Sequence, residues 1–313
     1  GPWADYGADA LGRGDRRGRF ADRRKDSIVH RWQNRPPGTM TGGQSADRGR
    51  GMQSIHPGRS GPLATASTGV HAWLSILCGA GCGLVLWLAV SSTLLPAASV
   101  PVRRLLELQA WGLGLGIVLA MTGLGVLLPR PSTASPWWNR SLAALAVVVV
   151  GGLLLLAMQR APQPDPTWRV LLAAVTAAGA LTAISGMALV ESVQAGLHLP
   201  LRLTQALLGG ASLLFALFAI GWQGAGLAAD PLSPLALLAL MTAALLLASW
   251  QGPAGLWPWA RWRGRWLALA LSTILPVLLA GLLHLQPDWA RVIWPLVALS
   301  VLAGTLVERR LAR

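Results

Sequence analysis

Charged side chains are scarce in this sequence: Asp, Glu, Lys and Arg make up 12% of its 313 residues, whereas 53% are hydrophobic. The mean hydropathy of +0.51 lies far above the usual range of soluble proteins. Uncharged apolar runs recur along the chain, and runs of about 18 residues or more are typical of membrane-spanning helices. The scarcity of charge therefore predicts an all-α integral membrane protein in a lipid bilayer.

Cysteine is scarcer still, with only Cys78 and Cys82, which lie four positions apart inside the first apolar run. A disulfide framework needs more cysteines in an exposed setting, and metal sites usually contain more closely spaced pairs. We interpret the two as small buried side chains. The sequence also contains no haem, iron–sulfur or zinc motif, so we expect no haem or metal in this chain.

Ionisable side chains are missing from the middle of every apolar run. Glu107, Glu191 and His198 lie near the ends of runs, where the membrane interface can solvate them. The sequence shows no series of carboxylates for a proton path, no carboxylate pair for a sodium site, and no nucleophile with a base. We therefore do not expect the chain to carry out chemistry unaided.

The net charge of +14 would favour nucleic acid as a partner if it were concentrated on one domain. Residues 1–69 contain twelve basic and six acidic side chains, and the remaining excess lies in short gaps between apolar runs. Arginine in such gaps is typical of the ends of membrane spans. We therefore expect no binding of nucleic acid.

Eight apolar runs are present, and they predict a bundle of eight transmembrane helices over residues 70–313. We place the spans near 70–95, 105–128, 141–159, 168–190, 199–221, 233–250, 266–285 and 290–307. The gap at 250–266, WQGPAGLWPWARWRGRW, contains five tryptophans and three arginines, as expected at the lipid headgroups.

An even number of spans places both ends of the bundle on one side of the membrane. That side has more arginine than the other, which predicts that it faces the cytoplasm. Its gaps contain Arg130, Arg140, Arg202, Arg261, Arg263, Arg265, Arg309, Arg310 and Arg313, and the other side has Arg103, Arg104, Arg160, Arg169 and Arg291.

Residues 1–69 are rich in Gly, Arg, Asp, Ser and Pro and show no apolar periodicity. Such a segment buries too little surface to offset its ordering entropy, so we expect a disordered basic tail. The chain starts with Gly1 rather than Met, and a start at Met52 would give a shorter segment before the first span. We hypothesise that residues 1–51 do not belong to the native protein.

Glycines cluster in the middle of the first run, WLSILCGAGCGLVLWLAV (73–90). Gly79 and Gly83 are four apart, so on a helix they form one flank where another backbone can approach closely. A phosphate-binding loop would need polar surroundings, a preceding strand and usually a Lys-Ser/Thr ending, all of which are lacking. We interpret Gly79 and Gly83 as helix-packing residues.

Four stretches resemble, in order and spacing, the membrane-anchor subunits of dimethyl sulfoxide reductase-type enzymes. HAWLSILCGAGCGLVLWLA (71–89) is similar to the first span of that family, and SPWWNRS (135–141) to the opening of its third span. ALVESVQAGLHLPLRLTQALLGGAS (188–212) and LAGTLVERRLAR (302–313) resemble two later passages. Eight spans is also the number in that family.

The resemblance implies a multi-pass subunit in a bacterial inner membrane, within an oxidoreductase complex that serves anaerobic respiration. It would tether an iron–sulfur electron-transfer subunit and a molybdopterin catalytic subunit, and pass electrons to them from menaquinol or ubiquinol. The redox cofactors would belong to the partners, in agreement with a chain that lacks redox ligands.

The chain departs from the family pattern where a proton acceptor is expected. The loop LLPRPSTASPWW lacks the family's histidine, and Ser141 stands where the family has a glutamate. The resemblance leaves Arg130, Trp137 and Arg140 as quinol-binding candidates, the arginines for a quinone oxygen and the indole for the ring. Glu107 or His198 would then accept the proton.

Two other functions are compatible with the same spans. A small-solute transporter usually has repeats or broken spans around a polar midplane; here only Pro276 interrupts a span clearly, and no duplicated pattern is evident in the sequence. The other alternative is a purely structural anchor without quinol chemistry, which the missing histidine and glutamate favour.

Overall fold

The computed structural model describes residues 62–94, 102–127, 136–161, 165–191, 197–221, 232–250 and 259–311, all within one compact unit, Arg59–Arg313. Every regular element in this part of the chain is helical. The elements are α2 (Pro62–Leu94), α3 (Val102–Leu127), α4 (Pro136–Gln159), α5 (Pro166–Glu191), α6 (His198–Gly221), α7 (Leu232–Trp250), α8 (Trp259–Leu269), η1 (Ala270–Ile274), α9 (Leu275–Leu282), η2 (Pro287–Trp289) and α10 (Ala290–Leu311).

The eight predicted spans are confirmed: over the described ranges, eight helical stretches are long and apolar enough to cross a membrane. The seventh stretch combines α8, η1 and α9, and the eighth begins in η2. Helix α2 starts at Pro62, before the predicted start of the first span at residue 70. Most of the predicted tail, and all of residues 1–51, lie outside the described residues.

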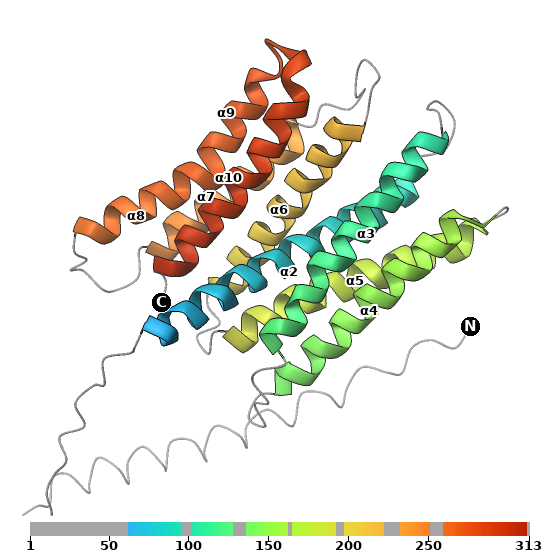
Figure 1. The fold of residues 1–313 in the computed structure, drawn as a ribbon, viewed down its shortest axis with the longest axis horizontal. Helices are drawn as coiled ribbons and strands as arrows, with labels where there is room; N and C mark the ends of the chain where they lie inside the picture. Colours follow the sequence, from blue (N-terminus) through green and yellow to red (C-terminus); the bar gives the residue numbers. More distant parts are fainter. Residues whose placement is uncertain are drawn as a thin grey trace, which may run out of the picture. The chain divides into compact units, whose positions relative to one another are not determined.

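Successive spans run in opposite directions through the bundle (Figure 1). The start of α2 and the end of α10 lie at the same end, which is also where α5 ends and α6 begins. We call this end the terminal face, and the end where α2 finishes and α3 starts the opposite face. Both described ends of the chain lie at one face, as an even number of spans requires.

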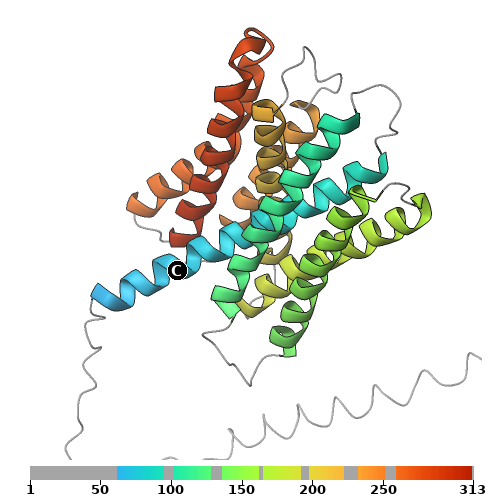
Figure 2. The same ribbon diagram turned by 45° about the vertical axis from the view of Figure 1, so that its right-hand side comes forward.

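Two groups of helices flank a central pair formed by α2 and α6. Figures 1 and 2 show α3, α4 and α5 on one side of this pair and α8, α9 and α10 on the other. On the first side α2 contacts α3 and α5, and α4 contacts both of these. On the second side α6 contacts α7 and α10, while α8 and α9 also contact α10. A large apolar core fills each side.

Small residues bring the two central helices into backbone contact. A Cβ on Gly83 would collide with the carbonyl of Ala206, and one on Gly210 would collide with the backbone of Gly83. At Gly79 the Cβ would lie 3.6 Å from that of Ala206, an ordinary contact. The structure thus gives Gly83 the packing role that the sequence suggests, whereas Gly79 has room for a methyl group.

Large apolar side chains cover the outside of the bundle. Trp111 is 76% exposed, Leu240 68% and Leu278 65%, each on a different helix. Patches of this kind are rare on soluble monomers, whereas lipid tails solvate them without cost. The outer surface therefore suits a multi-pass protein surrounded by a bilayer.

The seventh span contains one wide turn, η1, next to Pro276. Proline has no N–H to donate to the preceding turn, so the helix must rearrange there. Ser300 of α10 donates a hydrogen bond to the carbonyl of Leu271, 2.5 Å away. A Cβ on Gly304 would meet the backbone of Ser272 at 2.5 Å, so α10 packs closely against this turn.

Cys78 and Cys82 are free thiols with no exposed surface. We expect N-ethylmaleimide to label neither thiol in the folded protein within an hour, and both after denaturation in SDS. Intact-mass measurement after each treatment checks this. Rapid labelling of the folded protein would show that the core between α2, α3 and α5 is not packed as described.

Candidate functional site

A small pocket, with a cavity volume of about 30 Å³, lies among α2, α5, α6 and α10. The lining changes in character along the helices. Side chains further from the terminal face are mostly apolar, and those near the helix ends are mostly polar. The apolar part includes Ile76, Ala80, Ile184, Met187, Val301 and Leu302, and the polar part includes Ser75, Glu191, Arg202, Gln205, Thr305 and Arg309.

Glu191 connects three helices at the polar end. It occupies the last position of α5, and Ser75 of α2 donates a hydrogen bond to its Oε1. The guanidinium of Arg309, in the last turn of α10, lies 3.5 Å from the same oxygen. The side chain of Glu191 is 21% exposed, so the carboxylate is half-buried at the pocket wall.

A second carboxylate, Glu308, lies one position before Arg309. It accepts hydrogen bonds from Arg202 and Gln205 of α6, each at 3.4 Å, and the contact with Arg202 is an ion pair. The side chains of Arg202 and Glu308 are 14% and 12% exposed. Arg202 and Gln205 line the pocket but Glu308 does not, so its charge is directed toward Arg202.

These ion pairs allow charges to lie close to an apolar region. A charge that leaves water loses several kcal/mol of hydration, and a partner at hydrogen-bond distance recovers much of it. Pro200 in the first turn of α6 helps to fix this end, since proline suits a position where no helical N–H bond is needed. In chemical character, this lining matches a ligand that has an apolar body and one or two hydroxyl groups.

The structure places two predicted quinol-binding residues at the start of α4. The guanidinium carbon of Arg140 lies 4.9 Å from the centre of the Trp137 ring, a cation–π contact. Both residues are exposed, and neither lines the pocket. Arg130 lies outside the described residues.

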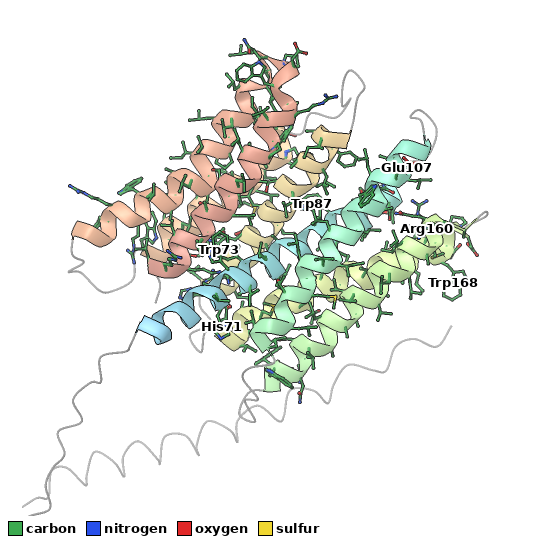
Figure 3. The ribbon with its side chains drawn as sticks, in the orientation of Figure 1. His71, Trp73, Trp87, Glu107, Arg160 and Trp168 are labelled. Carbon is green, nitrogen blue, oxygen red and sulfur yellow. The ribbon has the colours of Figure 1, made fainter. Side chains whose placement is uncertain are left out.

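The two predicted proton acceptors lie at opposite faces. Glu107, in the second turn of α3, is exposed at the opposite face, while His71 marks the terminal face (Figure 3). His198 begins α6 and is half-buried, one turn before Arg202 of the pocket. Among the quinol-binding candidates that the structure describes, His198 alone therefore lies next to the pocket, and Glu107 cannot share a site with Trp137 and Arg140.

Ser75, Glu191, Arg202 and Arg309 are the residues that the sequence analysis did not connect. They lie on four helices, and nothing in their local spacing indicates that they meet. A usable signal does exist: the tripeptide Leu-Val-Glu occurs at 189–191 and again at 306–308, each time at the end of a span. Within the described ranges, no cluster of three metal-ligating side chains occurs.

Comparison with protein-family models, curated proteins and solved structures finds no match for this chain. What these observations define is a multi-pass helical membrane protein with an amphiphilic pocket at one face.

Proposed function

We propose that this chain is the membrane-anchor subunit of a dimethyl sulfoxide reductase-type molybdoenzyme complex, and that it binds quinol in the pocket at the terminal face. The observation that carries the proposal is the character of this pocket. The apolar part of its lining matches a quinol ring and the start of an isoprenoid tail in chemical character, and its polar end matches the hydroxyl groups.

The chemistry of the lining supports this choice of ligand. Glu191 accepts a hydrogen bond from Ser75 and contacts Arg309, so the polar end offers both an acceptor and donors to a quinol oxygen. Met187 and Ile184, one and two turns earlier on α5, provide an apolar wall beside them. In this proposal the anchor holds the quinol, and the partner subunits take up its electrons through iron–sulfur clusters and molybdopterin.

Purification from native membranes in a mild detergent tests the assembly. We expect the chain to co-purify with iron and molybdenum in stoichiometric amounts, and with menaquinone or ubiquinone in the organic extract. A preparation with both metals but no quinone would favour a purely structural anchor. A preparation with neither metal would contradict the proposal.

Arg140→Ala distinguishes the two possible quinol sites. If quinol binds at the start of α4, as the resemblance implies, this variant should reduce quinol-dependent electron transfer. If quinol binds in the pocket, the rate should stay within about twofold of wild type, because Arg140 is exposed and outside the pocket. The rate of quinol oxidation in isolated membranes is the measurement, normalised to the amount of assembled complex. A loss of tenfold or more would place the quinol at α4.

Transport of a small solute is the second candidate, and the interrupted seventh span favours it. Irregular turns inside a membrane-spanning helix often accompany transport sites, and η1 interrupts this span between α8 and α9. Proteoliposomes that contain only this chain would show saturable solute uptake if this function were correct, whereas the anchor proposal predicts none.

A further inference from the structure

The described helices fall into two groups of four spans, α2–α5 and α6–α10, with a similar pattern of contacts. In the first half α2 contacts α3 and α5, and α4 contacts α3 and α5. In the second half α6 contacts α7 and α10, and the seventh span contacts both of these through α9. Contacts between the halves are paired in the same way: α2 touches α10, and α5 touches α6.

Contacts between the two central helices, α2 and α6, show which residues of the two halves correspond. At a two-fold axis, a residue faces its own equivalent. Gly83 faces Gly210, and Gly79 faces Ala206, and each pair is separated by 127 positions (210 minus 83, 206 minus 79). His71 and His198 have the same separation (198 minus 71), as the first histidines of the two central helices.

Helices α5 and α10, the last helices of the two halves, also correspond in sequence and in contacts. The Leu-Val-Glu tripeptide ends α5 at Glu191 and occurs in the last turn of α10 at Glu308. Each glutamate reaches the central helix of its own half, Glu191 to Ser75 and Glu308 to Arg202. Ser75 and Arg202 are also 127 positions apart (202 minus 75), so the two contacts are equivalent.

The pocket is lined by the two central helices and by the two helices that end in these glutamates. It therefore lies on the axis that relates the halves. Each glutamate has an arginine partner, Arg309 for Glu191 and Arg202 for Glu308, but the halves differ in position: Glu191 lines the pocket and Glu308 does not.

We propose that the chain is a tandem duplication of a four-span unit, and that only the first half presents its glutamate, Glu191, to accept a proton from the ligand hydroxyl in the pocket on the axis. Its equivalent, Glu308, holds α10 to α6 and takes no part in the reaction. This inference rests on the proposed function, which names quinol as the ligand.

The proton step balances as follows. A quinol O–H bond breaks, its proton passes to a carboxylate oxygen of Glu191, and one electron leaves toward the iron–sulfur subunit of the proposed complex. Glu191 then releases the proton to water at the terminal face, which its partly exposed side chain reaches. It accepts the second proton in the same way, so quinol yields quinone, two protons and two electrons.

The matched variants Glu191→Gln and Glu308→Gln test this inference in the assembled complex. Each removes one negative charge opposite an arginine at an equivalent place, so their effects on folding are comparable. We expect Glu191→Gln to lower quinol-dependent electron transfer about a hundredfold with bound quinone unchanged, since a positioned base contributes 10²–10⁴-fold. Glu308→Gln should stay within about threefold of wild type.

Ser75→Ala provides a second variant should Glu191→Gln fail to assemble, because it keeps the ion pair and removes only the hydroxyl donor. We expect a fall of about three- to tenfold with the bound quinone retained. A wild-type rate in Glu191→Gln, an equal loss in Glu308→Gln, or an unchanged rate in Ser75→Ala would overturn the inference while leaving the anchor function intact. Absence of quinone and of quinol oxidation in the wild-type complex would overturn both.

Discussion

Gly83→Leu should prevent the bundle from assembling. The first side-chain atom at this position would overlap the carbonyl of Ala206, and backbone cannot move aside as a flexible side chain does. Overpacking of a dense core costs about 3 kcal/mol in severe cases, and separating α2 from α6 also disrupts the core around them. We expect the detergent-solubilised variant to lose most of its monodisperse peak in size-exclusion chromatography.

Gly114→Leu is the matched control, because a Cβ at Gly114 would meet nothing within 4 Å. Gly114→Leu changes the composition and the helix propensity as Gly83→Leu does, but it lies on α3 and causes no collision. We expect this variant to elute as wild type does, with equal or higher thermal stability. If Gly83→Leu behaved like this control, α2 and α6 would not cross at the glycines as described.

Arg202→Met should lower the free energy of unfolding by about 3 kcal/mol. The substitution leaves the carboxylate of Glu308 mostly buried without its ion-pair partner, and removal of one member of a buried pair costs 3–5 kcal/mol. We expect the double variant Arg202→Met, Glu308→Met to regain most of the stability, because two packed apolar side chains replace the pair without a buried charge. Equilibrium unfolding in SDS–detergent mixtures measures both changes.

Arg169→Met is the control for this series, since it removes an arginine from the first turn of α5, where residues 165–168 are exposed. A change below about 0.5 kcal/mol is expected for a surface substitution of this kind. Equal effects of Arg169→Met and Arg202→Met, or a double variant no more stable than the single one, would contradict a buried pair between α6 and α10.

The spans could be predicted from the sequence because hydrophobicity over 20 residues is a local property. Every predicted span overlaps a membrane-length helical stretch of the structure, and α7 ends at Trp250 as predicted, whereas α8 already starts at Trp259, inside the predicted gap at 250–266. The boundaries at the terminal face were less predictable. Helix α2 extends back to Pro62, through residues whose composition resembles a loop more than a span.

The pocket was not predictable in the same way. Glu191 and Arg202 lie next to predicted helix ends, where a solvated side chain is the ordinary interpretation. Only the packing of α2, α5, α6 and α10 brings them to one place, and that packing depends on close backbone contacts at Gly83 and Gly210. The duplication could not be predicted from the sequence either, because few residues are identical between the halves. Contacts between α2 and α6 are needed to show which residues correspond.

Photolabelling with an azido-quinone tests the central claim most directly. With the complex in native membranes, illumination should attach the label to peptides that contain Ser75, Glu191 or Arg309, and excess menaquinol should suppress it. Mass spectrometry of the digested chain identifies the labelled positions. Suppressible labelling at Trp137–Arg140 instead, or no suppressible labelling on this chain, would contradict a quinol site between the two halves.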